Sequence, residues 1–130
     1  GAGRLVYHGD HFQQVLDLHP SPASAIEFCV GTISEMPGTD VYATVERYSA
    51  AGKIAYVHLR NVRGKAPDYR EMFIDDGDTD MLEVLRILHS NGFEGVLMPD
   101  HTPLLECDAP WHSGMAHALG WMRAALMSIG

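Results

Sequence analysis

Apolar and polar positions alternate along the chain in blocks that predict strands and helices in turn. Short continuous apolar runs are typical of buried strands, and they occur at residues 26–30, 54–59 and 95–98. Apolar residues at helical spacing predict four helices. These helices are predicted at residues 10–18, where Asp10 is the cap, at 41–51 and 80–90, and over 115–126.

The longest connection between these elements runs over residues 60–80 and is rich in polar residues. It is predicted to be a loop without a strand or helix of its own. Connections longer than about 12 to 15 residues are uncommon in compact domains and are often functional or disordered. We therefore expect ligand contacts in this loop.

The alternation of strands and helices, in units of about 30 to 40 residues, is typical of a parallel sheet built from βαβ crossovers. Three parallel strands with helices on one side leave the other sheet face and both edges uncovered. The predicted fold class is therefore α/β, a partial (β/α)8 TIM barrel with about three parallel strands alternating with four helices. A whole barrel takes about 250 residues, whereas this chain has 130. We expect a homo-oligomer that buries the open sheet face.

Composition and charge exclude several classes of protein. Hydrophobic residues make up 46% and charged residues 20%, which is not the composition of a disordered tail. A net charge of -8 argues against a nucleic-acid partner, because DNA affinity comes largely from Lys and Arg. No apolar run approaches the roughly 20 residues of a membrane span, and residues 1–10 lack a secretory pattern, so the expected location is the cytoplasm. Cys29 and Cys107 are expected to be free thiols.

Each predicted strand ends in a side chain that can bind a cation, namely Cys29, His58 and Asp100. In (β/α)8 barrels the active residues come from the carboxyl ends of the strands. Strand alternation places His58 on the same face as Ile54 and Tyr56. Cys, His and Asp together suit a divalent ion such as Mn, Fe, Co or Zn. The alternative is a structural set, with a buried thiol, a hydrogen-bonded imidazole and a capping carboxylate.

Glu27 is an acidic residue within an otherwise apolar strand run. Alternation places it on the face that Cys29 occupies. A buried carboxylate without a partner is costly, so we expect Glu27 to have a partner or to face a polar barrel interior.

Several segments resemble the motifs of D-mannonate dehydratases. They are the cysteine segment at 26–36, the sequence VHLRNVRG at 57–64, the acidic segment at 73–81, and Pro99-Asp100-His101. These motifs occur in the family's order and spacing, and the resemblance covers residues 12–126. It implies that residues 1–130 are the C-terminal part of a TIM barrel similar to that of the xylose isomerases.

The resemblance also implies an activity, the metal-dependent dehydration of D-mannonate to 2-keto-3-deoxy-D-gluconate in hexuronate catabolism, with Mn or Fe(II). Carried over by position, Cys29, His58 and Asp100 match metal ligands, and His101 matches a residue of acid–base catalysis. These residue types suit the reaction. A divalent ion stabilises the charge that forms when a proton α to a carboxylate leaves, while a His moves the proton.

Four further residues match positions around the substrate. The resemblance implies substrate contacts for Arg60 and Asn61, and it places Asp76 and Asp78 in a loop that helps to close the site. An Arg side chain suits the bidentate binding of a sugar-acid carboxylate.

The sequence departs from the family pattern at two places. The family has a further metal-binding His in an upstream His-Pro-Asp-Asp motif that these 130 residues do not contain, and His8 and His11 lie in a different context. Some members use a Tyr shortly before the last helix, whereas no Tyr follows Tyr69 here. His112 and His117 are the candidates to replace it.

Two other functions remain open at this point. One is a catalytically incomplete partial barrel that serves as an oligomerising or interaction module. The other is a metal-dependent sugar isomerase similar to xylose isomerase. The Cys29 ligand and the Asp100–His101 pair favour the dehydratase.

Overall fold

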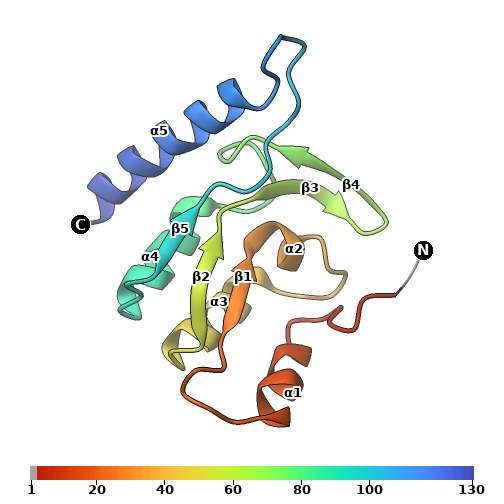
Figure 1. The fold of residues 1–130 in the computed structure, drawn as a ribbon, viewed down its shortest axis with the longest axis vertical. Helices are drawn as coiled ribbons and strands as arrows, with labels where there is room; N and C mark the ends of the chain where they lie inside the picture. Colours follow the sequence, from red (N-terminus) through yellow and green to blue (C-terminus); the bar gives the residue numbers. More distant parts are fainter. Residues whose placement is uncertain (1–2) are drawn as a thin grey trace.

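The computed structural model describes residues 3–130 and has a three-stranded parallel sheet at its centre (Figure 1). The strands are β1 (Ile26–Cys29), β2 (Ile54–His58) and β5 (Val96–Met98), in the order β1-β2-β5. Helices α3 (Val41–Ala50) and α4 (Met81–Ser90) connect these strands and pack on one face of the sheet (Figure 1). The predicted parallel sheet is confirmed. Among the helices of residues 3–130, none combines the length and the apolar character that a membrane span requires.

The other two predicted helices also form. They are α1 (His11–Leu18) and α5 (His112–Ile129). A short helix that was not predicted, α2 (Val30–Ser34), follows β1 directly. The prediction that the strand includes Val30 was wrong, because this residue begins α2 and is fully buried there. An apolar run that continues from a strand into a buried helix gives no change of pattern at the boundary.

The segment after β2 forms a hairpin, so the prediction of an unstructured loop over residues 60–80 was wrong. Strands β3 (Asn61–Lys65) and β4 (Asp68–Met72) pair antiparallel and project from the carboxyl end of the sheet (Figure 1). The usual strand signal is weak here, because only Val62 of β3 is a buried apolar residue. Backbone pairing and charged side chains stabilise this hairpin instead.

The two faces of the parallel sheet differ in character. Phe28 and Val57 are register partners, are fully buried, and belong to the core against α3 and α4. The opposite face carries side chains that include Val96 and Met98, which are 61% and 38% exposed, so the helices of residues 3–130 leave it open. Three strands with helices on one side therefore leave one face uncovered, as the sequence predicted.

Ile54 lies in the core and not on the open face. The register between β1 and β2 shifts by one residue, so that Ile54 pairs with Ile26 whereas Tyr56 pairs with Glu27. Ile54 is 9% exposed and packs with the core. The prediction that Ile54 shares a face with His58 was therefore wrong, because the irregularity interrupts the alternation.

Two glycines of α5 provide a matched test of its packing. A Cβ on Gly114 would lie 2.8 Å from Cβ of Thr102, whereas a Cβ on Gly120 would meet no atom within 4 Å. We expect Gly120→Ala to raise the free energy of unfolding by about 0.5 to 1 kcal/mol through helix propensity. Gly114→Ala is expected to lower it by about 1 to 3 kcal/mol through overpacking, as measured by urea denaturation. Equal stability of the two variants would contradict the tight contact at Thr102.

Candidate metal centre

The carboxyl ends of the three parallel strands bring Cys29, His58 and Asp100 together. Cys29 and His58 are register partners in β1 and β2, and Met98 of β5 is the partner of His58 on the other side. Asp100 follows Met98 by two residues. One ligand atom from each of the three side chains lies within 4.8 Å of the others, and all three residues are half-buried.

This donor set fits one divalent cation. A thiolate, an imidazole nitrogen and a carboxylate oxygen are ordinary ligands of first-row metals, at about 2.0 to 2.3 Å from the ion. Ligand atoms at such distances from a shared ion lie within about 4.6 Å of one another, so the observed separations need little adjustment. Cys29 can serve as a ligand because it forms no disulfide, and Cys107 is likewise free and exposed.

His58 lies between two carboxylates. Its Nδ1 is 3.1 Å from Oε1 of Glu27 and 3.6 Å from Oδ2 of Asp100. The expectation that Glu27 has a partner is therefore met, and the residue also lies on the open sheet face beside Tyr56. Loss of solvent and the nearby carboxylate of Glu27 raise the pKa of Tyr56 above its ordinary value.

His101 lies beside the cluster and outside it. Its Nε2 is 3.5 Å from Oδ1 of Asp100, and its side chain is 54% exposed. The ring stands nearly perpendicular to that of Trp111, with the two ring centroids 6.3 Å apart. An exposed imidazole at this position can exchange protons with a molecule that is bound at the cluster.

Comparison with models of known protein families assigns the chain to one family. The family described as D-mannonate dehydratase (UxuA) matches residues 1–127. The chain belongs to the D-mannonate dehydratase family. Mannonate dehydratase of Lactococcus lactis subsp. cremoris is 28% identical over 127 residues, and that of Streptococcus uberis is 30% identical over 125 residues. Each alignment covers 92% of this chain and 36% of the relative, so the chain spans about a third of the length of these relatives.

Solved structures agree with the family assignment. The crystal structure of mannonate dehydratase from Streptococcus suis serotype 2 matches with a TM-score of 0.81 and 25% identity, over 98% of this chain and 40% of that chain. A xylose isomerase domain protein from Planctomyces limnophilus matches with a TM-score of 0.78, over 93% of this chain and 44% of that chain. At 16% identity, this second likeness shows the fold alone. The predicted partial TIM-barrel fold is confirmed.

In this member of the dehydratase family, Arg60 is buried in an ion-pair network. Its Nη2 lies 2.5 Å from Oε1 of Glu71 and 3.2 Å from Oε2 of Glu35. Arg4 reaches Glu35 from the surface at 2.9 Å. Burial alone would lower the pKa of Arg60, but the hydrogen bond and the charge of Glu71 raise it above its ordinary value. The guanidinium is therefore charged and already paired with carboxylates of the chain.

Asn61 is completely buried and holds residues 73–79 against the hairpin. Its Nδ2 donates to the backbone oxygens of Ile74 and Thr79, both at 2.9 Å. Its Oδ1 accepts hydrogen bonds from the backbone N–H groups of Val62 at 3.0 Å and Thr79 at 3.3 Å. Each polar group of the amide therefore has a partner within the chain.

Asp76 and Asp78 are bound to the same hairpin. Asp76 pairs with Arg63 at 3.0 Å, and Asp78 accepts a hydrogen bond from the backbone N–H of Gly64 at 2.8 Å. Neither Asp76 nor Asp78 is among the grouped donors Cys29, His58 and Asp100. Arg60 lies near enough to Cys29 for the charge of that residue to contribute, after Glu71, to its raised pKa. The four residues of predicted substrate contact lie in or beside the hairpin that begins three residues after His58.

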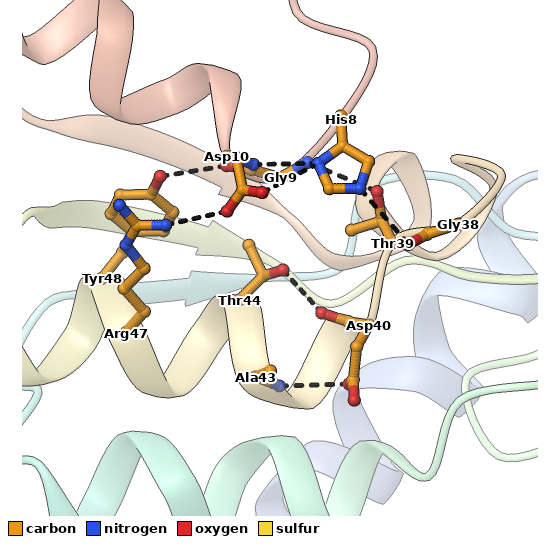
Figure 2. A pocket seen from close by; sticks show the side chains of 10 residues that line it. All are labelled: His8, Gly9, Asp10, Gly38, Thr39, Asp40, Ala43, Thr44, Arg47 and Tyr48. Atoms are coloured by element: carbon orange, nitrogen blue, oxygen red, sulfur yellow. Dashed lines mark hydrogen bonds and ion pairs between the residues drawn. The ribbon is translucent and has the colours of Figure 1, made fainter.

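One hollow of the molecule lies between α3 and the segment before α1, with a volume of about 330 Å³ (Figure 2). Its polar side chains are paired with one another or with the backbone. Arg47 binds Asp10 at 2.8 Å, and the Tyr48 hydroxyl donates to the backbone oxygen of Gly9 at 3.0 Å. Figure 2 shows these contacts joining the two segments. The ion pair and the hydrogen bond therefore anchor residues 8–10 to α3.

A second hollow, of about 440 Å³, lies between the segment after β4 and the start of α5. His117 of α5 lies in it, with Nε2 3.0 Å from Oδ1 of Asp75, and this hydrogen bond lowers the pKa of Asp75. The sequence analysis did not find this pair, because the two residues are 42 positions apart. His117, a candidate to replace the late Tyr of the family, is thus already partnered by a carboxylate.

Proposed function

We propose that this chain supplies part of the active site of a metal-dependent mannonate dehydratase, a hydro-lyase that converts D-mannonate to 2-keto-3-deoxy-D-gluconate. The observation that carries the proposal is the meeting of Cys29, His58 and Asp100 within 4.8 Å, in a chain of that family. The isomerase alternative has only a likeness of fold in its favour, at 16% identity. An interaction module without catalysis would not need three donors at the strand ends.

Mn or Fe(II) is the proposed cofactor, held by Cys29, His58 and Asp100. Imidazole and carboxylate donors suit these ions, and a thiolate favours the softer Fe(II). A bound divalent cation supplies electrostatic stabilisation of the negative charge that develops when the proton next to a carboxylate leaves.

His101 is the proposed acid–base residue. Its Nε2 lies 3.5 Å from Oδ1 of Asp100, so the exposed imidazole is next to the proposed ligands, where it can take a proton from the substrate or give one to the departing hydroxyl.

The contacts of Arg60, Asn61, Asp76 and Asp78 with D-mannonate stay predictions. Their partners within the chain support a different task, which is to hold the hairpin and residues 73–79 beside the strand ends. In that task these side chains shape the wall of the site.

The remaining features of the proposal concern the setting of the site. Residues 1–130 are the proposed C-terminal part of the barrel, and the protein is a proposed cytoplasmic homo-oligomer without nucleic-acid or membrane partners. Support for assembly comes from the open sheet face, where Val96 is 61% exposed. Support against a nucleic-acid partner comes from the net charge of -8.

Substitution of a donor residue tests the proposal directly. The wild-type chain is expected to bind one Mn(II) or, under anaerobic conditions, one Fe(II), as measured by isothermal titration calorimetry. Cys29→Ala is expected to weaken binding by more than about 100-fold, because loss of a ligand costs more than loss of a group that only orients one. The matched control is Cys107→Ala, which removes the exposed thiol and should leave the affinity unchanged.

Two outcomes would contradict the proposal. A folded wild-type chain that binds neither ion would exclude the metal centre. Equal affinities of Cys29→Ala and Cys107→Ala would exclude Cys29 as a ligand. An assay for keto-acid product from D-mannonate on the same metal-loaded samples then measures the activity.

A further inference from the structure

Glu27 faces His58 from the neighbouring strand. It lies two residues before Cys29 on β1, and its register partner on β2 is Tyr56, two residues before His58. Oε1 of Glu27 is 3.1 Å from Nδ1 of His58, and the Glu27 side chain is 49% exposed. Among residues 3–130, the donor cluster includes Cys29, His58 and Asp100 but not Glu27.

The position of Glu27 decides which nitrogen of His58 carries the proton. A neutral imidazole has one N–H and one nitrogen with a free lone pair. An acceptor 3.1 Å from Nδ1 favours the tautomer in which Nδ1 carries the hydrogen and Nε2 keeps its lone pair. Asp100 lies 3.6 Å from the same nitrogen, beyond ordinary hydrogen-bond distance, so Glu27 is the closer acceptor.

Tyr56 lies beside Glu27 on the neighbouring strand. The centroid of its ring is 5.5 Å from that of the His58 ring. All three side chains project from β1 and β2, which are held together by backbone pairing. The carboxylate therefore lies beside the imidazole on paired strands, which limits how far the two groups can move apart.

We propose that Glu27 is a positioning residue of the metal centre. Its carboxylate accepts the Nδ1 hydrogen of His58, fixes the tautomer and orientation of the ring, and so raises the affinity of the site for a divalent cation. Ligating His residues commonly donate their other N–H to a carboxylate, and loss of that carboxylate typically costs about 10- to 100-fold in metal affinity. The inference rests on the proposed metal-dependent function and adds a residue outside the donor set.

Two substitutions separate the hydrogen bond from the charge. Glu27→Leu removes both the acceptor and the charge, whereas Glu27→Gln keeps an amide oxygen that can accept the same hydrogen bond. We expect Glu27→Leu to weaken Mn(II) binding by about 10- to 100-fold and Glu27→Gln to recover part of that loss. The control is Glu83→Leu, which removes an exposed carboxylate of α4 whose partner is Arg86 and should leave the affinity unchanged.

A second measurement reports on the ring itself. Nitrogen-15 NMR of the cation-free chain, at a pH where His58 is neutral, is expected to show the proton on Nδ1 in the wild type. Glu27→Leu is expected to shift the population toward the Nε2–H tautomer. Circular dichroism shows whether each variant is folded, and a half-exposed position such as residue 27 should tolerate these changes.

Three results would overturn the inference. They are an unchanged Mn(II) affinity in Glu27→Leu, equal losses in Glu27→Leu and Glu27→Gln, and a proton on Nε2 in the wild type. If the wild-type chain binds no cation, the proposed function fails. The tautomer in the cation-free chain still tests the contact between Glu27 and His58, so the two failures are distinguishable.

Discussion

Replacement of Arg60 by methionine is expected to lower the free energy of unfolding by about 3 to 5 kcal/mol. The reason is that Glu35, which is 1% exposed, would lose its buried partner at 3.2 Å, and Glu71 would lose the contact at 2.5 Å. Arg4 would remain beside Glu35, but its side chain is 54% exposed and compensates weakly. Urea denaturation followed by circular dichroism measures the change.

The matched control is Arg63→Met on the same hairpin. Arg63 pairs with Asp76, and its side chain is 42% exposed, so the expected loss is below about 1 kcal/mol. The double variant Arg60→Met with Glu35→Gln is expected to recover part of the stability, because no buried charge is then left on Glu35. Equal losses for Arg60→Met and Arg63→Met would show that the Arg60 network does not stabilise the fold.

Asn61→Ala is expected to lower the free energy of unfolding by about 2 kcal/mol or more, because each buried polar group left without a partner costs about 1 to 3 kcal/mol. The backbone oxygens of Ile74 and Thr79 would lose donors at 2.9 Å, and the Thr79 N–H would lose an acceptor. Residues 73–79 are expected to open first, as faster hydrogen exchange of the backbone amides around Thr79 would show.

Asn91→Ala is the control for Asn61→Ala. Asn91 also uses its Nδ2 as a donor, to Glu46 at 3.1 Å and to Ser49 at 2.9 Å, but it lies half-buried at the end of α4. Its removal is expected to cost less than about 1.5 kcal/mol. If Asn61→Ala costs no more than Asn91→Ala, the amide of Asn61 does not hold the segment in place.

The sequence predicted the parallel sheet because its strands are apolar and separated by helices of the expected length. The prediction for residues 54–59 differs from β2 by one residue, and that for 80–90 matches α4 within one residue. The hairpin was missed because its strands carry charges where a buried strand would carry apolar residues. The side chains that stabilise it are ion pairs, which leave no periodic signal.

The candidate site also has a part that the sequence could predict and a part that it could not. The meeting of Cys29, His58 and Asp100 could be predicted, because the carboxyl ends of parallel strands lie at one edge of a sheet. The partners of Arg60 could not, because Glu35 and Glu71 lie 25 and 11 residues from it in the chain. An Arg that suits a substrate carboxylate also suits a carboxylate of its own chain, and sequence alone does not distinguish the two.

The distribution of the three donors over three strands couples the site to folding. β5 pairs with β2 through three residues, and any state in which that pairing is open would hold Cys29 and His58 but not Asp100 in place. A cation that needs all three donors would bind the fully paired sheet alone, and by mass action it would stabilise that state over every partly folded one. Cation uptake would then report the completion of folding, and chelation would remove the stability that the cation adds to the pairing of β5.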